Sequence, residues 1–347
     1  MKQTEYLDLM DYYFRNADPL VYEEIKKDFE DHFRQGIEDG KKEEEIAHEL
    51  GDPKEIFLEY KEEGIIEENA RFDFSIFGTI FDEIGEKFSK KKKRNELQNY
   101  SRNIPEQVHR IEIASEGYNI KIRNHKENSI SIHYLSEKSG DLPIQTKGSL
   151  LKIGSLEPNH LLNPSEAPYV KKAEIWIPEG NDMGINIWSL SGNSDIDVLN
   201  NDITLRAGKG EILLRSKGRS AVIDAALANV KVRGDQKEIY IKTAAGNIDV
   251  NSRTAEMDIN TISGKVQVRM LKSRELKIRS ISSDIRLQMA ELEGKVKASS
   301  MSGEICIDKG ISDDVKKYGK SIEEKWSEEH RSIHMSSVSG NISVEKL

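Results

Sequence analysis

The chain has 347 residues, of which 36% are hydrophobic and 33% charged, and it carries a formal net charge of −9. This length predicts one to three domains, and the composition is typical of a globular protein that can bury a core. The single cysteine, Cys306, excludes an internal disulfide and a cysteine-rich metal site. The sequence has neither an apolar run of about 18 residues nor a basic-then-apolar N-terminal segment, so we expect a cytoplasmic protein without a transmembrane helix.

Charge divides the chain into two parts. Residues 1–70 hold nine Lys/Arg and 22 Asp/Glu, a net charge of −13, which leaves +4 for residues 71–347. Such an asymmetry between segments indicates separate domains. A surface this acidic repels phosphate, so we expect no direct binding of nucleic acid by the N-terminal part.

The acidic part is predicted to be a small helical bundle. Asp18-Pro19 and Asp52-Pro53 are typical of helix starts, and Gly51 is typical of a helix end. Three or four helices in about 60 residues give only a marginal core, so we expect this bundle to gain stability by docking on another part of the protein. The apolar residues that follow helical spacing lie at 6–14, 21–33, 46–50 and 56–60.

The sequence of this part resembles a known signalling module. The segments DFEDHF, at 28–33, and GKKEEEIAHELGDPKEI, at 40–56, are similar to the HAAS domain of Firmicutes, and the resemblance covers about residues 1–65. It implies an accessory domain that accompanies PadR-type winged-helix transcription regulators and binds a protein partner. The candidate partner contacts are Glu43, Glu44, Glu45 and Glu49.

A linker is predicted over residues 66–104. Its apolar side chains share one face of a helix, and five basic residues follow them. An apolar face beside a basic cluster is typical of a helix that lies on an anionic membrane, where each basic residue contributes about 1 kcal/mol. The alternative is a helix that packs on a neighbouring domain. The candidate membrane contacts are Phe74, Phe77, Phe81, Phe88, Lys90, Lys91, Lys92, Lys93 and Arg94.

The remaining residues, 105–347, contain an internal repeat. In each unit we take one residue, at the turn between two apolar segments, as the corner residue. Apolar residues stand two and four positions after this corner residue, and also five and seven positions before it. A small residue stands three positions before it. Each unit therefore predicts two short strands joined at a tight corner. The corner residues lie at 210, 228, 246, 264, 283, 303 and 340, which gives steps of 18, 18, 18, 19, 20 and 37.

Stacking these units in chain order would bury all of their aliphatic residues, which favours a β-solenoid with about 18 residues per coil over a sandwich or barrel of hairpins. The predicted fold class is therefore α + β and multidomain, with a helical bundle followed by an all-β solenoid. The solenoid divides into irregular coils at 105–200, regular coils at 203–308, an insertion at 309–332 and a last coil at 333–347. Within the insertion we expect a short helix, near 321–329.

The repeated unit also resembles a known family. TISGKVQV, at 261–268, and SVSGNISV, at 337–344, are similar to the bacterial "putative adhesin" family, which is common in Firmicutes. The resemblance implies a β-solenoid and an association of some relatives with the membrane and with the response to envelope stress.

No arrangement of residues points to catalysis, so we predict a protein that is not an enzyme and uses no cofactor or metal. His330 and His334 are four residues apart, but His334 falls in an outward column, which favours a surface residue over a metal ligand. The predicted function is a signalling accessory protein whose helical domain binds a protein partner, with the solenoid as a rigid platform. The alternative is an envelope-stress or adhesin-like protein that docks through residues 74–94 at the inner face of the membrane.

Overall fold

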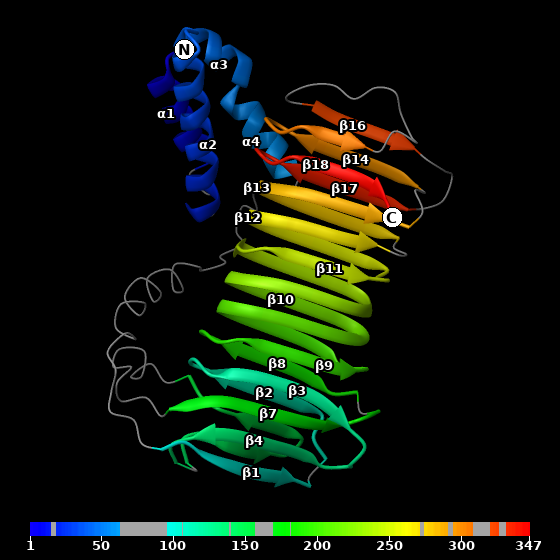
Figure 1. Cartoon of the computed structure of the whole chain (residues 1–347). Coiled ribbons are helices and arrows are strands. Elements are labelled where there is room, and N and C mark those ends of the chain that lie inside the picture. Colours follow the sequence, from blue (N-terminus) through cyan, green and yellow to red (C-terminus); the bar gives the residue numbers. More distant parts are fainter. Residues whose placement is uncertain are drawn as a thin grey trace.

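A small helical region packs at one end of a large, elongated β-rich domain in the computed structural model of the chain (Figure 1). The strands lie across the long axis of this domain, and each rests on the next. The residues that the structure describes are 1–14, 19–62, 96–105, 107–138, 140–156, 169–180, 182–270, 274–290, 294–307, 320–325 and 331–347.

The helical region has the four helices that the apolar spacing predicts. Pro19 and Pro53 begin α2 and α4, where a proline loses no helical hydrogen bond, and Gly51 follows α3 with φ +90°. In the core, the ring of Phe33 lies edge-on to that of Tyr6, with centroids 5.4 Å apart. The helices are α1 (Gln3–Tyr13), α2 (Pro19–Glu38), α3 (Glu43–Leu50) and α4 (Pro53–Glu62).

The β-rich domain is built mainly from parallel pairs between successive turns of the chain. Its strands are β1 (Gln98–Ile104), β2 (Arg110–Ser115), β3 (Asn119–His125), β4 (Ile130–Ser136), β5 (Ile144–Lys147), β6 (Leu150–Ile153), β7 (Val170–Pro178), β8 (Gly184–Ser189), β9 (Ser194–Leu199), β10 (Asp202–Ala245), β11 (Ile248–Ser252), β12 (Glu256–Met270), β13 (Glu275–Met289), β14 (Lys295–Ser300), β15 (Ile305–Ile307), β16 (Lys320–Lys325), β17 (Ser332–Ser337) and β18 (Ile342–Lys346).

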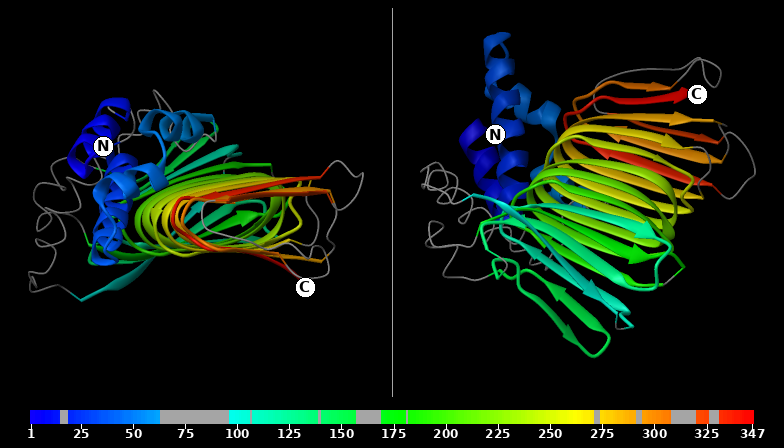
Figure 2. Two further views of the ribbon diagram at one scale, coloured as in Figure 1. Left: turned by 90° about the horizontal axis from the view of Figure 1, so that it is seen from above. Right: turned by 60° about the horizontal axis from the view of Figure 1, so that its bottom comes forward.

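The register of these pairs repeats along the domain. Ile248 lies beside Val230 on one side and Val266 on the other, and all three side chains are buried. Equivalent residues therefore form aliphatic ladders that run along the interior. Seen along the long axis, the strands outline a flattened coil (Figure 2). The buried side chains of the ladders form the core of this domain. The apolar positions predicted from the repeat are those that fill this core.

A glycine and an asparagine shape some corners of the coil, among them the corner at residues 246–247. Gly246 has φ +128°, and a Cβ atom there would lie only 2.1 Å from the carbonyl oxygen of Ala228, so the corner requires glycine. Asn247 follows it, and its Oδ1 accepts a hydrogen bond from the backbone N–H of Lys265 at 3.1 Å. The N–H of Asn247 in turn donates to Oδ1 of Asn229 at 2.9 Å, so side-chain hydrogen bonds join three successive turns.

At the C-terminal end, the stacking order departs from the chain order. The last two strands, β17 and β18, pair with β13 on one side and with β14 and β15 on the other. The expectation that each coil stacks on the preceding one is therefore wrong here. The expected helix near 321–329 is also wrong in its described part, because residues 320–325 form β16, which pairs antiparallel with β14. The pairing with β16 satisfies backbone N–H and C=O groups of β14 that would otherwise be exposed at the edge of the sheet.

The other end of the domain uses the same arrangement. Strands β2 and β3 lie between the β6–β7 turn and the β8–β9 turn, although they precede both in the chain. Antiparallel β5 pairs with β6, and β4 and β1 continue the sheet beyond β7. Because β1 starts at Gln98, the β-rich domain begins before the boundary placed at residue 105.

The helical region docks on the β-rich domain through its core. Ile281 and Val338 are only 2% and 3% exposed and belong to the same apolar cluster as the helix side chains. Ile262 and Met301 pack against this cluster, and α2 contacts β13. The expected docking of the marginal bundle is therefore present, at the opposite end of the domain from β1 (Figure 1).

Candidate functional site

The four candidate partner contacts lie on α3, and they divide into two pairs. Oε2 of Glu43 accepts a hydrogen bond from the backbone N–H of Gln3 at 2.9 Å, which joins α3 to α1. Glu45 accepts one from the N–H of Lys42 at 3.2 Å and caps its own helix. Glu44 and Glu49 are exposed, so their carboxylates stand at the surface of the helical region.

Glu49 has a cation beside it. Its Oε2 lies 2.7 Å from Nζ of Lys41, and the hydrogen bond from Lys41 lowers the pKa of Glu49. Both groups are solvated, so we expect this ion pair to be screened by salt and to yield readily to a competing cation. The surface of α3 is therefore suited to electrostatic contact with a basic partner.

The candidate membrane contacts Phe74, Phe77, Phe81, Phe88 and Lys90–Arg94 all lie outside the described residues. Contact of this segment with a membrane therefore stays a prediction. Among the helices that the structure describes, none combines the length and the apolar character that crossing a bilayer requires.

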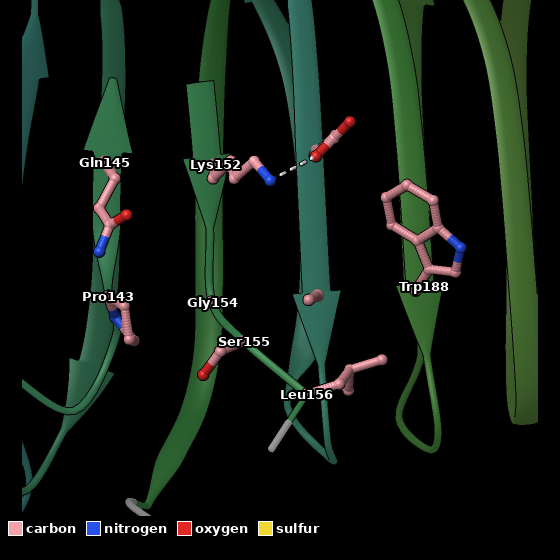
Figure 3. Close-up of a pocket in the computed structure, with 9 residues that line it drawn as sticks. Pro143, Gln145, Lys152, Gly154, Ser155, Leu156 and Trp188 are labelled. Carbon is pink, nitrogen blue, oxygen red and sulfur yellow. Dashed lines mark ion pairs between the residues drawn. The ribbon is translucent and has the colours of Figure 1, made fainter. Parts of the chain in front are cut away.

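A groove of about 590 Å³ lies on the outer face of the first turns of the β-rich domain. Strands β2, β6 and β8 and the region of β5 contribute its walls, so residues far apart in the sequence meet there (Figure 3). The groove is lined by Glu112, Ala114, Pro143, Gln145, Lys152, Gly154, Ser155, Leu156 and Trp188.

Small residues make the floor of the groove. Pro143 and Trp188 stand on opposite sides of Gly154 (Figure 3), and Ala114 lies beside Trp188 in the register of β2 and β8. Gly154 has φ +77°, and a Cβ atom there would lie 2.0 Å from the carbonyl oxygen of Ala114. Only glycine allows this close approach. The hydroxyl of Tyr118 donates to the same carbonyl at 2.7 Å and fixes the turn below the floor.

Polar side chains line one side of the groove. Nζ of Lys152 lies 3.3 Å from Oε2 of Glu112, and Gln145 stands next to Lys152 across the β5–β6 pair. An indole ring, an ion pair and an amide together suit a small polar ligand that has one apolar face. Sequence analysis did not identify this groove, although Trp188 is a large aromatic residue at an outward position of its strand.

His334 is half-buried on β17, between Lys277 of β13 and Lys297 of β14, and so is more enclosed than the surface position expected for it. Burial lowers the pKa of His334, and the neighbouring cations Lys297, Arg279 and Lys277 act in the same direction. His330 lies outside the described residues. Over the described ranges, no group of three or more His, Cys, Asp or Glu side chains is placed to hold a metal ion.

Comparisons with solved structures return bacterial β-rich proteins. A putative adhesin from Parabacteroides distasonis is 11% identical, with a TM-score of 0.44, over 73% of this chain and 98% of that one. A putative adhesin from Bacteroides fragilis is 12% identical, with a TM-score of 0.39, over 74% and 100%. One from Parabacteroides merdae is also 12% identical, with a TM-score of 0.42, over 73% and 96%. None of the curated proteins compared matches the chain.

Two family models match, and they divide the chain as the fold does. The HAAS model matches residues 5–59, which hold the helices, and the model of the toastrack family DUF4097 matches residues 108–345, which hold most of the strands. Neither family indicates a catalytic activity. The chain therefore belongs to the DUF4097 toastrack family and carries an N-terminal HAAS domain.

Proposed function

We propose that this chain is a non-enzymatic signalling accessory protein. Its HAAS domain binds a protein partner, for which a PadR-type transcription regulator is the candidate, and its toastrack domain is a β-solenoid that acts as a rigid binding platform. The single observation that carries the proposal is the attachment of an acidic helical domain to the end coils of a stack of buried aliphatic ladders.

The outer faces of the toastrack domain support a platform role. Some of their charged residues pair along the stack, as where Nη2 of Arg215 lies 2.7 Å from Asp195 and its Nε lies 2.9 Å from Asp197. Such pairs join neighbouring turns and contribute modestly to rigidity. The groove beside Trp188 combines one such pair, Lys152 with Glu112, with an aromatic wall and a small-residue floor, and it is the candidate ligand site of the platform.

The exposed carboxylates of α3 indicate the kind of protein surface that the HAAS domain can bind. A net charge of −13 over residues 1–70 attracts a basic protein surface and speeds the encounter with it. Because Glu44 and Glu49 are exposed, their contribution is to association and specificity more than to the stability of the domain.

Size-exclusion chromatography of the full chain with a PadR-type regulator from the same genomic neighbourhood tests this proposal. We expect a complex at micromolar concentrations that weakens as salt is raised, and the double variant Glu44→Lys, Glu49→Lys should lose it. Glu211→Lys, a charge reversal at an exposed position of β10, is the matched control. If the two proteins elute separately at low salt and micromolar concentration, the proposed partner is wrong.

The alternative function rests on the apolar face and basic run within residues 74–94. In that case, the protein is an envelope-stress or adhesin-like protein held at a membrane surface. Sedimentation with anionic vesicles should carry the full chain down at low salt and release it at high salt. Equal sedimentation with neutral and anionic vesicles, or none with either, would remove this alternative.

A further inference from the structure

One position of the coil changes its character along the toastrack domain. The residue two positions before the corner is Gly208, Ala226 and Ala244 in the first regular coils. In the later coils the same position holds large apolar residues. The side chain at this position lies outside the aliphatic ladders. The packing of the ladders therefore does not explain why small residues are replaced by large ones. The large residues are Ile262, Ile281, Val338 and Met301, named in their order along the stack and called here the corner strip.

The last coil, which lies inside the stack, contributes a residue to the middle of the strip. The N–H of Val338 donates to the carbonyl oxygen of Ile281 at 3.0 Å, and the N–H of Ser302 donates to the carbonyl oxygen of Val338 at 3.0 Å. These bonds place Val338 between Ile281 and Met301. Neighbouring strands stand about 4.8 Å apart, so the four side chains form an unbroken apolar row on a rigid backbone.

The HAAS domain covers this row. Ile281 and Val338 are almost fully buried in its core cluster, and Ile262 and Met301 pack at the margin of the cluster. Gly208, Ala226 and Ala244 do not belong to that cluster. The change from small to large residues therefore coincides with the extent of the HAAS contact.

The place of contact is not set by chain connectivity. The chain enters the toastrack domain at β1, and the strip lies at the opposite end of the stack (Figure 1). A connection of the length of residues 63–97 can span about 100 Å when extended, so its length alone permits many positions of the HAAS domain. The burial of Ile281 and Val338 in the helical core marks the position that the domain takes.

We propose that the corner strip is a dedicated docking surface for the HAAS domain, and that non-covalent contact with the strip, rather than the connecting segment, holds the HAAS domain at the last coils. The strip supplies the wall that the marginal helical core lacks, so the two domains form one body. This inference goes beyond the proposed function and does not depend on it, because no outside partner takes part. A partner of the docked HAAS domain then meets the exposed surface of α3, since the opposite apolar side is occupied.

Cleavage of the connection in the otherwise intact protein tests the inference. A protease site is inserted between residues 63 and 64, the folded chain is cut, and the fragments are followed by size-exclusion chromatography over a dilution series. We expect the helical fragment to stay with the toastrack fragment at micromolar concentrations. If it elutes separately from the cut wild-type protein, contact with the strip does not hold the domain and the inference is wrong.

Substitutions inside and outside the corner strip test whether the side chains of the strip hold the HAAS domain. Ile281→Asp should weaken the association of the fragments by at least about tenfold, because a charge would be buried in the helical core. Ala244→Asp, at the same coil position outside the contact, is the matched control and should leave the association unchanged. Equal effects of the two variants would overturn the assignment. If Ile281→Asp fails to fold, Ile281→Ala and Val338→Ala replace it, and an unchanged association in both would contradict the inference.

Discussion

The backbone N–H of Val338 donates to the carbonyl oxygen of Ile281 at 3.0 Å, although the two residues belong to coils that another coil separates in the chain. This bond reflects the insertion of the last coil between β13 and the β14–β15 turn. It places two apolar side chains together at the corner where the HAAS domain docks. The stacking order thus makes Val338 the neighbour of Ile281 in the domain interface.

The corner glycines should be indispensable. Replacing Gly246 with alanine forces a side chain onto the carbonyl oxygen of Ala228 in a backbone conformation that L residues avoid, so we expect a loss of about 1–3 kcal/mol in the free energy of unfolding. Gly140→Ala, at a turn with open space around it, is the control and should change little. Thermal and denaturant unfolding measure both. A stability of Gly246→Ala equal to that of the control would contradict this account of the corner.

The asparagine hydrogen bonds between coils should contribute through their acceptor atom. Asn247→Ala removes the acceptor of the Lys265 N–H and should lower the free energy of unfolding by about 0.5–1.5 kcal/mol. Asn247→Asp keeps an oxygen at that position and should restore much of the loss. Denaturant unfolding of the two variants compares them, and an equal loss in both would show that the side-chain acceptor is not what matters.

The interior ladders should dominate the stability of the toastrack domain. Val250 is fully buried between the ladders of adjacent coils, and Val250→Ala should destabilise the domain through lost burial and the resulting cavity, by about 1–3 kcal/mol. Leu227 is an exposed aliphatic residue of the same domain, and Leu227→Ala should stay within about 0.5 kcal/mol of wild type. A larger effect at Leu227 than at Val250 in denaturant unfolding would place the core elsewhere.

Stability should fall in acid partly through Asp195. Burial raises the pKa of Asp195, but hydrogen bonds and charges from Arg123 and Arg215 outweigh it and hold the pKa below its usual value. A carboxylate whose pKa is lower in the folded state contributes stability above its unfolded pKa of about 4, and that contribution is lost as the pH falls through the folded pKa. Asp195→Asn should therefore flatten the decline of the melting temperature below about pH 4.

The exposed Asp235 provides the control for this pH dependence. Asp235→Asn should leave the acid decline of the melting temperature as steep as in wild type. If Asp195→Asn and Asp235→Asn follow the same curve as the wild-type protein, the arginine contacts of Asp195 do not contribute measurably to acid sensitivity.

Sequence analysis predicted the helices and the repeat because both depend on periodic apolar positions. The order of the coils could not be obtained in the same way. Ile285 pairs with Ile342, which also pairs with Ile305, and all three occupy the same position of the repeat. Any of these coils therefore matches any other in register and in apolar pattern, so the pattern alone does not determine which of them are neighbours.

The groove escaped prediction for a related reason. Ala114 and Trp188 are far apart in the sequence and become neighbours through the insertion of β2 and β3 into the stack. Their proximity follows from the coil order and leaves no local motif. The corner strip, in contrast, carries a signal that a comparison of equivalent coil positions reveals, because small residues give way to Ile262 and Ile281.

Hydrogen–deuterium exchange of the full chain, with and without the PadR-type regulator, tests the central claim most directly. That claim is that the HAAS domain is the partner-binding end of the protein. The account predicts slower exchange in the partner complex at Glu43–Leu50 of α3, with the strands of the toastrack domain unchanged. Protection confined to residues 98–347, with α3 exchanging as in the free protein, would contradict it.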